Sequence, residues 1–312
     1  MAATKRIVVF GGNGFLGSRI CRAAVSRNWD VTSVSRSGEP HWSSVTASSL
    51  PPSWAHKVSW ERADIFVPAQ WVSLLQGADY VVHSLGILLE ADYKGVISGR
   101  ESPISGLARA FDPNHAGAHS RNPLERMRDE QQHQQQQQQQ QGQQQHRPDP
   151  AIDPAPKAPA QLTYEMMNRD SAILLAKEAA AAGARAFGFV SAAGGAPVLP
   201  ARYISTKREA EAVVAREFPG MRGVFFRPPF MYDRSRTLTI PMAALAAAGS
   251  AFNGLTGGVL SGFLGAAGAK PLKADTVADA VAEGLADESV KGPVEVPQLE
   301  ELANKAWRKS ML

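Results

Sequence analysis

Two groups of residues have the types and spacing that chemistry requires. Tyr203 and Lys207 stand four residues apart, so on a helix they share one face and the ammonium group can stabilise the phenolate. An unperturbed tyrosine titrates near pH 10, so a base that works near neutrality needs about 4 kcal/mol of stabilisation of its anion. The pair is a candidate proton donor or acceptor; the other interpretation is an aromatic residue at a helix start followed by a solvated lysine.

The second group is a glycine-rich loop near the start of the chain. Three glycines, each three residues from the next, follow an apolar run at 6–10 and lead into a helical pattern at 15–27. Glycine lets the backbone approach a pyrophosphate, and the N-terminus of the following helix offers free N–H groups to it. This context predicts a dinucleotide site and not a purely structural turn. The loop residues expected to contact the cofactor are Gly11, Asn13, Gly14, Phe15, Leu16 and Gly17.

The ends of the next two strands indicate which dinucleotide binds. NAD sites usually place a carboxylate at the end of the second strand, where this chain has Ser35 and Arg36. A hydroxyl and a guanidinium suit the 2′-phosphate of NADP(H), so we expect NADP(H) to be favoured over NAD(H). The alternative is that Arg36 is a solvated loop residue. After the third strand, Asp64 and Ile65 lie where the adenine ring would rest, and the carboxylate can accept a hydrogen bond from its amino group.

The elements that must position these residues follow an alternating pattern. Short apolar runs alternate with helical patterns, which predicts βαβ units and a doubly wound parallel α/β sheet. The expected strands are 6–10, 31–35, 57–60, 79–83, 185–190 and 223–226. The expected helices are 15–27, 72–75, 165–182, 203–217 and 276–287. We predict a Rossmann domain over residues 1–100 and 161–237, and a small substrate lobe with C-terminal helices over residues 238–312.

Residues 101–160 interrupt this pattern with Gln, His, Pro and charged side chains. Such a segment cannot bury enough apolar surface to offset its ordering entropy, so we expect a disordered Gln-rich insertion. His115 and His119 have a spacing that would suit a metal on a helix, but Gly117 separates them and no third ligand is near. We therefore expect no metal site.

Composition argues against several other classes of protein. The 312 residues have a net charge of +4 and no run of five Lys or Arg residues, which gives little support to nucleic-acid binding. The one cysteine, Cys21, excludes an internal disulfide and indicates a reducing compartment. No segment has the Leu, Ile, Val and Phe density of a membrane-spanning helix.

Together these features resemble the extended or atypical short-chain dehydrogenase/reductases. The resemblance rests on the glycine loop, on residues 81–89 and on the segment 203–211. It implies an active site in which Tyr203 exchanges the proton, Lys207 is its electrostatic partner, Ser191 binds the substrate oxygen and Asn168 anchors a water. The further cofactor contacts that we expect are Ser84, Gly86, Lys207 and Pro228, of which Pro228 belongs to a segment that resembles the one beneath the nicotinamide.

Within this family the chain is most similar to the fungal mitochondrial reductases attached to the coenzyme Q biosynthetic complex. More distantly it resembles the reductase-fold accessory subunit of respiratory complex I. The resemblance implies a mitochondrial protein on the matrix side of the inner membrane that contributes to ubiquinone production, as an NADP-dependent reductase or as a non-catalytic subunit. A sensor of the nucleotide ratio is a third possibility. The start of the chain, acid-poor before Asp30, fits an import signal, but cleavage would remove the glycine loop, so no cleavable presequence is expected.

The segment 237–269 has no charged residue and is rich in Ala and Gly. Polar substrates are usually held by fixed charges, so this composition favours a lipophilic ligand, such as a polyprenylated ring, or a face that rests on a membrane or a partner. A flexible loop with small-residue packing explains the same composition. The sequence leaves both interpretations open.

Overall fold

One parallel sheet organises the chain. A computed structural model describes residues 4–46, 48–86, 122–141, 163–194, 201–233 and 270–311. Seven strands form the sheet in the order β3-β2-β1-β4-β5-β6-β9, and all six neighbouring pairs are parallel. The strands are β1 (Arg6–Phe10), β2 (Asp30–Ser35), β3 (Val58–Arg62), β4 (Tyr80–His83), β5 (Ala186–Val190), β6 (Arg222–Phe226) and β9 (Gly292–Val294). The order reverses between β1 and β4, which makes this the doubly wound sheet expected from the sequence.

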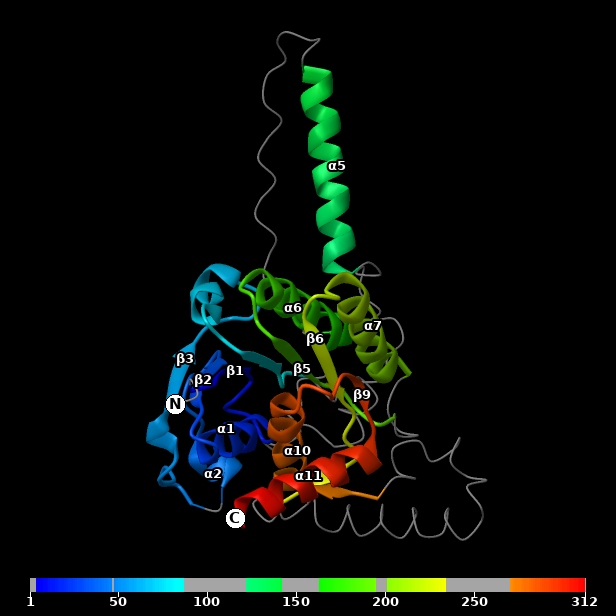
Figure 1. Cartoon of the computed structure of the whole chain (residues 1–312). Coiled ribbons are helices and arrows are strands. Elements are labelled where there is room, and N and C mark those ends of the chain that lie inside the picture. The colour runs from blue at the N-terminus through cyan, green and yellow to red at the C-terminus, as the bar shows by residue number, and fades with distance from the viewer. Residues whose placement is uncertain are drawn as a thin grey trace, which may run out of the picture.

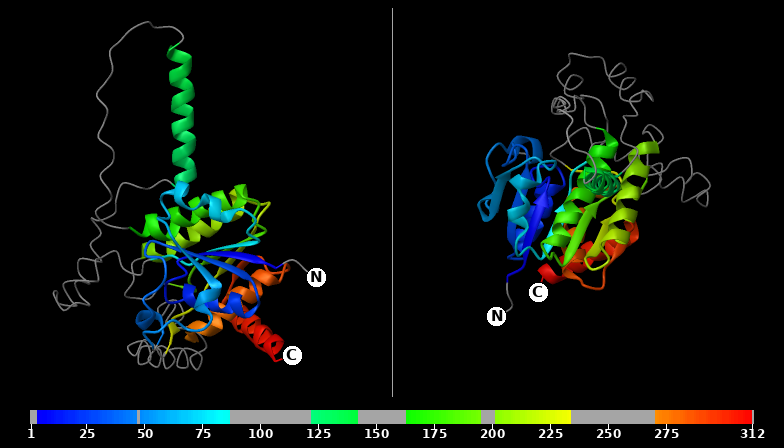
Figure 2. Two further views of the ribbon diagram at one scale, coloured as in Figure 1. Left: turned by 90° about the vertical axis from the view of Figure 1, so that its left-hand side faces the viewer. Right: turned by 90° about the horizontal axis from the view of Figure 1, so that it is seen from above.

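Helices cover both faces of the sheet (Figures 1 and 2). On one face lie α1 (Gly17–Ser26), α10 (Ala274–Ala286) and α11 (Val296–Ser310). On the other lie α6 (Ser171–Ala181), preceded by the π-helical turn η5 (Glu165–Asp170), and α7 (Ala201–Glu217). The shorter helices are α2 (Trp42–Val45), η1 (Ala55–Lys57), η2 (Pro68–Gln70) and η3 (Val72–Leu75).

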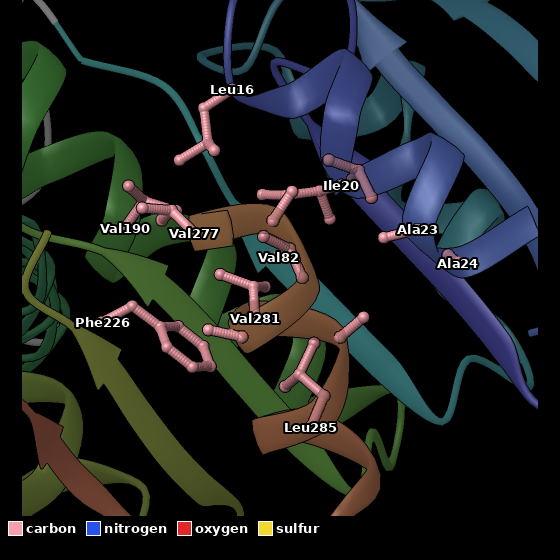
Figure 3. Close-up of a cluster of buried hydrophobic side chains, with 14 of the residues drawn as sticks. Leu16, Ile20, Ala23, Ala24, Val82, Val190, Phe226, Val277, Val281 and Leu285 are labelled. Carbon is pink, nitrogen blue, oxygen red and sulfur yellow. The ribbon is translucent and has the colours of Figure 1, made fainter. Parts of the chain in front are cut away.

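Two hydrophobic cores hold the layers together, one on each face of the sheet. In the first, Ile20 of α1 and Val281 of α10 pack with Val82 of β4, all fully buried (Figure 3). In the second, Phe187 of β5 and Leu175 of α6 belong to one buried cluster with strand β1. The central strands β1, β4 and β5 are mainly apolar and buried because both of their faces are covered, whereas β3 at the edge of the sheet is polar and largely exposed.

The C-terminal region differs from the expected substrate lobe. Strand β9 extends the main sheet beside β6, and α10 packs against α1 on the sheet, so residues 274–310 complete the Rossmann layers. A separate pair of short parallel strands, β7 (Met231–Tyr232) and β8 (Leu272–Lys273), leads into α10. The uncharged stretch 237–269 lies outside the described residues.

The Gln-rich insertion also differs from expectation over part of its length. Residues Pro123–Gln141 form helix α5, which extends away from the body of the molecule (Figure 1). Asn122 caps it: its side-chain oxygen accepts from the backbone N–H groups of Leu124 and Glu125, and the Glu125 carboxylate accepts from the N–H of Asn122. This reciprocal cap, followed by residues with good helix propensity, explains the local order. His115 and His119 lie outside the described residues.

No helix within the described ranges is both long enough and apolar enough to cross a bilayer.

Candidate functional site

The glycine loop after β1 is packed so closely that side chains are excluded. A Cβ atom on Gly17 would lie 2.1 Å from the carbonyl oxygen of Gly11, and one on Gly12 would lie 2.3 Å from Ser33 Oγ. Gly11 itself has a φ of +84°, which favours glycine. The N–H of Gly14 donates to the Gly11 oxygen at 2.9 Å, which closes the turn at the start of α1. This backbone-lined cradle is the shape that a pyrophosphate requires.

A cleft of about 170 Å³ opens beside this loop, at the carboxyl ends of the strands. Five of the residues predicted to contact the cofactor line it: Asn13, Ser35, Arg36, Asp64 and Ile65. Phe66, Leu85 and Met167 add apolar surface. The carboxyl edge of a doubly wound sheet, next to the switch point, is where such folds bind nucleotides. The cleft therefore fits the adenosine half of a dinucleotide.

The polar groups at the end of β2 are not assembled around a 2′-phosphate. The buried hydroxyl of Ser35 donates to the carbonyl oxygen of Gly38 at 2.9 Å, so its proton is already used. Arg36 is exposed at the rim of the cleft. Asn13 donates to Ser37 Oγ at 2.7 Å, which ties the glycine loop to the residues after β2.

Asp64 has one oxygen committed to its own turn. Its Oδ1 accepts from the N–H of Phe66 at 2.9 Å, and its backbone N–H donates to Gln70 Oε1. The indole N–H of Trp71 donates to the Asp64 carbonyl oxygen at 3.1 Å. These hydrogen bonds hold the loop after β3 in place, and Asp64 lines the cleft.

Lys207 is the centre around which the other predicted catalytic residues gather. Its ammonium group is buried and donates to the carbonyl oxygen of Val190, the residue before Ser191, at 3.1 Å. A Cβ on Gly86 would lie 3.5 Å from Lys207 Nζ and 3.1 Å from Asn168 Oδ1. Gly86 therefore leaves room between the amide and the ammonium, and a Cβ there would be in tight contact with the Asn168 side chain.

Tyr203 lies one helical turn before Lys207, and its ring centroid is 5.8 Å from the ammonium nitrogen. The ring also meets Tyr164 edge-on, with centroids 6.0 Å apart. Burial raises the pKa of Tyr203 to about 12, and the guanidinium of Arg208 opposes this rise. The phenol is consequently protonated near neutral pH, which suits a proton donor better than a base.

Ser191 is held by a residue that the sequence reasoning missed. Arg208 Nη1 donates to Ser191 Oγ at 2.9 Å and to Glu211 Oε1 at 2.7 Å. Arg227 also pairs with Glu211 and reaches Glu295 at 2.5 Å. The signal available in the sequence was the i,i+3 spacing of Arg208 and Glu211 directly after Lys207.

Asn168 lies in a distorted helical turn. The span expected as one helix, 165–182, begins with the π-helical turn η5 before α6. Single π-turns inside helices are rare and are frequent at functional sites. Here the turn places Asn168, fully buried, against the position of Gly86.

His83, at the end of β4, is a second buried group that the sequence reasoning did not single out. Its Nε2 lies 2.8 Å from Ser171 Oγ, which itself donates to the Met167 carbonyl oxygen, so Nε2 is the protonated nitrogen. Burial, together with the charge of Lys207, lowers the pKa of His83 to about 3. The imidazole is therefore neutral at physiological pH and adds no charge beside Lys207.

The remaining predicted cofactor contacts lie along the same edge. The N–H of Ser84 donates to the Phe10 carbonyl oxygen at 2.9 Å, which extends the pairing of β1 and β4. Pro228 is buried, and its carbonyl oxygen accepts from the N–H of Ala193 at 2.8 Å. Among the described residues, no group of three or more His, Cys, Asp or Glu side chains is placed to hold a metal ion.

The burial of Lys207 leads to a prediction about stability at alkaline pH. Burial lowers the pKa of Lys207 to about 8, Glu211 opposes this effect and Arg208 adds to it. Above that pH the folded chain releases a proton that the unfolded chain keeps, so the free energy of unfolding should rise, by roughly 2 kcal/mol between pH 7 and pH 10. Urea unfolding of the nucleotide-free protein measures this, with Lys207→Met as the control that lacks the rise. Identical pH dependence in both proteins would contradict it.

Fold and site together define a Rossmann-type dinucleotide-binding protein of the short-chain dehydrogenase/reductase kind. Residues 7–91 match the model of the NAD dependent epimerase/dehydratase family. The chain is 36% identical over 250 residues to MIOREX complex component 2 of Saccharomyces cerevisiae, which covers 76% of each protein. This similarity shows that the chain and the yeast protein belong to one family, of the short-chain dehydrogenase/reductase kind.

Other similarities are shorter or more distant. An uncharacterized chloroplastic protein of Arabidopsis thaliana is 43% identical over 83 residues, 27% of this chain and 25% of that one. The UDP-glucuronic acid 4-epimerase of Bacillus cereus, solved in complex with NAD, has a TM-score of 0.49 and 13% identity, covering 93% of this chain and 78% of its own. MoeE5, solved with UDP-glucuronic acid and NAD, has a TM-score of 0.48 and 14% identity, covering 92% and 74%.

The expected preference for NADP(H) over NAD(H) is wrong. The family model that matches residues 7–91 is described as NAD dependent. The physical reason lies at the end of β2, where the Ser35 hydroxyl donates to the Gly38 carbonyl oxygen and Arg36 is exposed to solvent. The presence of a hydroxyl and a guanidinium in the sequence did not by itself make a phosphate site.

Proposed function

We propose that this protein is an NAD-dependent oxidoreductase that acts on a lipophilic carbonyl, in the class of quinone precursors, and contributes to mitochondrial ubiquinone production. One observation carries the proposal: the buried ammonium of Lys207, with the Tyr203 ring 5.8 Å away and Val190, Gly86 and Asn168 around it. A lysine with a purely structural role is rarely buried unless it pairs with a carboxylate. Burial of a catalytic lysine has a use, because it shifts the pKa of the ammonium group. The resemblance noted in the sequence supports the mitochondrial, matrix-side location.

The residues present fit the cofactor. The glycine loop would hold the pyrophosphate, the cleft lined by Asp64 and Ile65 would hold the adenosine, and Lys207 would reach the nicotinamide ribose. A bound NAD(H) would supply or accept the hydride. Tyr203, protonated near neutral pH, would give its proton to the substrate oxygen in the reductive direction, and Lys207 would stabilise the phenolate that remains. Ser191 would donate a hydrogen bond to that same oxygen.

A second candidate function has its own support. A non-catalytic subunit, stabilised by its bound nucleotide, fits the naming of the yeast relative as a component of a complex. The raised pKa of Tyr203 is consistent with this role as well, because a phenol that no longer exchanges protons has no need of a tuned pKa. In this role the dinucleotide would contribute to stability through its binding energy alone.

Substitution of Tyr203 by phenylalanine distinguishes the two functions. The change removes one oxygen and leaves the ring volume almost unchanged, so folding and NADH binding should persist. Fungal cells that lack the protein should recover ubiquinone with the wild-type chain and fail to recover it with Tyr203→Phe at matched abundance. Tyr80→Phe, at a buried position in β4 away from Lys207, is the matched control and should restore ubiquinone.

Equal recovery with wild type and Tyr203→Phe would exclude proton exchange at Tyr203 and leave the subunit role. Failure of the wild-type chain itself to restore ubiquinone would contradict the ubiquinone assignment in either form. NADH fluorescence titration of each purified variant shows whether the cofactor site is intact in the same proteins.

A further inference from the structure

Arg208 joins the two segments that carry the candidate catalytic residues. It follows Lys207 on α7, and its guanidinium reaches the chain after β5. Nη1 donates to Ser191 Oγ at 2.9 Å, and Nη2 donates to the carbonyl oxygens of Ala192 at 2.7 Å and Ala193 at 3.3 Å. The side chain is 29% exposed, so these contacts lie at the margin of the site.

The contact with Arg208 determines the direction of the Ser191 hydroxyl. A guanidinium has only donors, so Ser191 Oγ accepts from it and keeps its own proton free. Among the described residues that proton has no acceptor. Because hydrogen bonds in a chain polarise one another, a hydroxyl that already accepts from a cation is a stronger donor. An oxygen of a bound substrate would be the acceptor for the Ser191 hydroxyl proton, so that the hydrogen bonds run from Arg208 through Ser191 to the substrate.

The guanidinium is fixed in place from its other side. Glu211, only 4% exposed, accepts from Arg208 Nη1 at 2.7 Å and is also paired with Arg227. Arg227 in turn pairs with Glu295 at the start of α11. A charged group held by several partners has little reorganisation to undergo when negative charge develops near it.

We propose that Arg208 is a positioning residue for the reaction, which directs the Ser191 hydroxyl toward the substrate oxygen and supplies a second fixed positive charge beside Lys207. The inference rests on the proposed function. The direction of the pKa changes agrees with it: the Arg208 guanidinium lowers the pKa of Tyr203 against the effect of burial, and lowers that of Lys207.

The charge of Arg208 can be tested without a known substrate. The charged groups near Tyr203 are Lys207 and Arg208 on α7, with Arg202 paired to Glu165 where η5 meets the start of α7. The full chain with bound NAD⁺ is labelled with ¹³C at the tyrosine ζ carbons, and the Tyr203 signal, assigned with Tyr203→Phe, is followed to pH 11. We expect Arg208→Met to raise the pKa of Tyr203 by about one unit, so that its signal stays fully protonated where the wild type has begun to ionise.

Arg227→Met is the matched control, because it removes a guanidinium from the same Glu211 carboxylate without any contact to Ser191. It should move the Tyr203 titration less than Arg208→Met does. Equal shifts in the two variants, or no shift in Arg208→Met, would overturn the proposal. Circular dichroism at each pH ensures that only folded protein is compared.

A double-mutant cycle tests whether Arg208 acts through Ser191. In the ubiquinone rescue, Ser191→Ala and Arg208→Met should each reduce the ubiquinone content, and the double variant should lose no more than the stronger single variant. Losses that multiply in the double variant would overturn action through Ser191. If Tyr203→Phe restores ubiquinone fully, the proposed function fails, whereas the titration still decides on the charge of Arg208.

Discussion

Replacing Gly17 with alanine is expected to abolish NADH binding and to lower the free energy of unfolding by about 3 kcal/mol. The new Cβ would lie 2.1 Å from the Gly11 oxygen and 2.8 Å from the Gly11 carbonyl carbon and Gly12 Cα. All three are backbone atoms, so no side-chain rotation relieves the clash. The loop would have to move away from α1, and its N–H groups would no longer converge on a pyrophosphate. Fluorescence titration with NADH and urea unfolding measure the two effects.

Gly220→Ala provides the control for this substitution. Gly220 lies in the turn before β6, and a Cβ there would have no neighbour within 4 Å. It should bind NADH like the wild type and unfold within about 0.5 kcal/mol of it, as surface substitutions usually do. Gly17→Ala that binds NADH within about threefold of wild type would contradict the assignment of this loop to the pyrophosphate.

The first part of the fold could be predicted because its signals are local. Buried parallel strands read as short apolar runs, and three glycines between a strand and a helix have few other uses. The expected strand 6–10 and the first turns of the helix after the loop match β1 and α1 within two residues. Strand β9 gave no such signal, because Gly292–Val294 has three residues and contains a proline. It is a strand only because β6 leaves an open edge beside it.

The sequence named candidate site residues, but it did not indicate the contacts that they make. Lys207 and Asn168 were found from spacing and resemblance, and the structure places both around the position of Gly86. The role of Arg208 was not predicted, because an arginine beside a lysine on a helix is expected to be solvated. The spacing of Arg208 and Glu211 indicates their pairing, but the contacts of Arg208 with the chain after β5 depend on how that chain meets α7, which no sequence pattern shows. The error on NADP(H) has the same origin: Ser35 turns its hydroxyl to Gly38.

One charged residue within α10 shows how the C-terminal helices are joined to the nucleotide-binding half. Glu283 is fully buried among apolar neighbours. Its carboxylate pairs with Arg27 after α1 at 3.1 Å, with Lys309 of α11 at 2.5 Å and with Lys305 at 3.7 Å. Three cations from two other segments therefore meet on one carboxylate, which ties α10 both to the helix that follows the glycine loop and to the C-terminal helix.

Glu283→Gln should consequently lower the free energy of unfolding by about 3 kcal/mol, because a neutral amide removes the counter-charge that Arg27 and Lys309 share, while Lys305 keeps its pair with Asp287. Glu288→Gln is the matched control: Glu288 is 73% exposed in its pair with Arg185, and the loss should stay under about 1 kcal/mol. Urea unfolding followed by Trp fluorescence and by circular dichroism measures both. If the C-terminal helices complete the Rossmann layers, the two signals of Glu283→Gln shift together in one transition. A separate early transition would instead indicate that the C-terminal helices fold as a unit of their own.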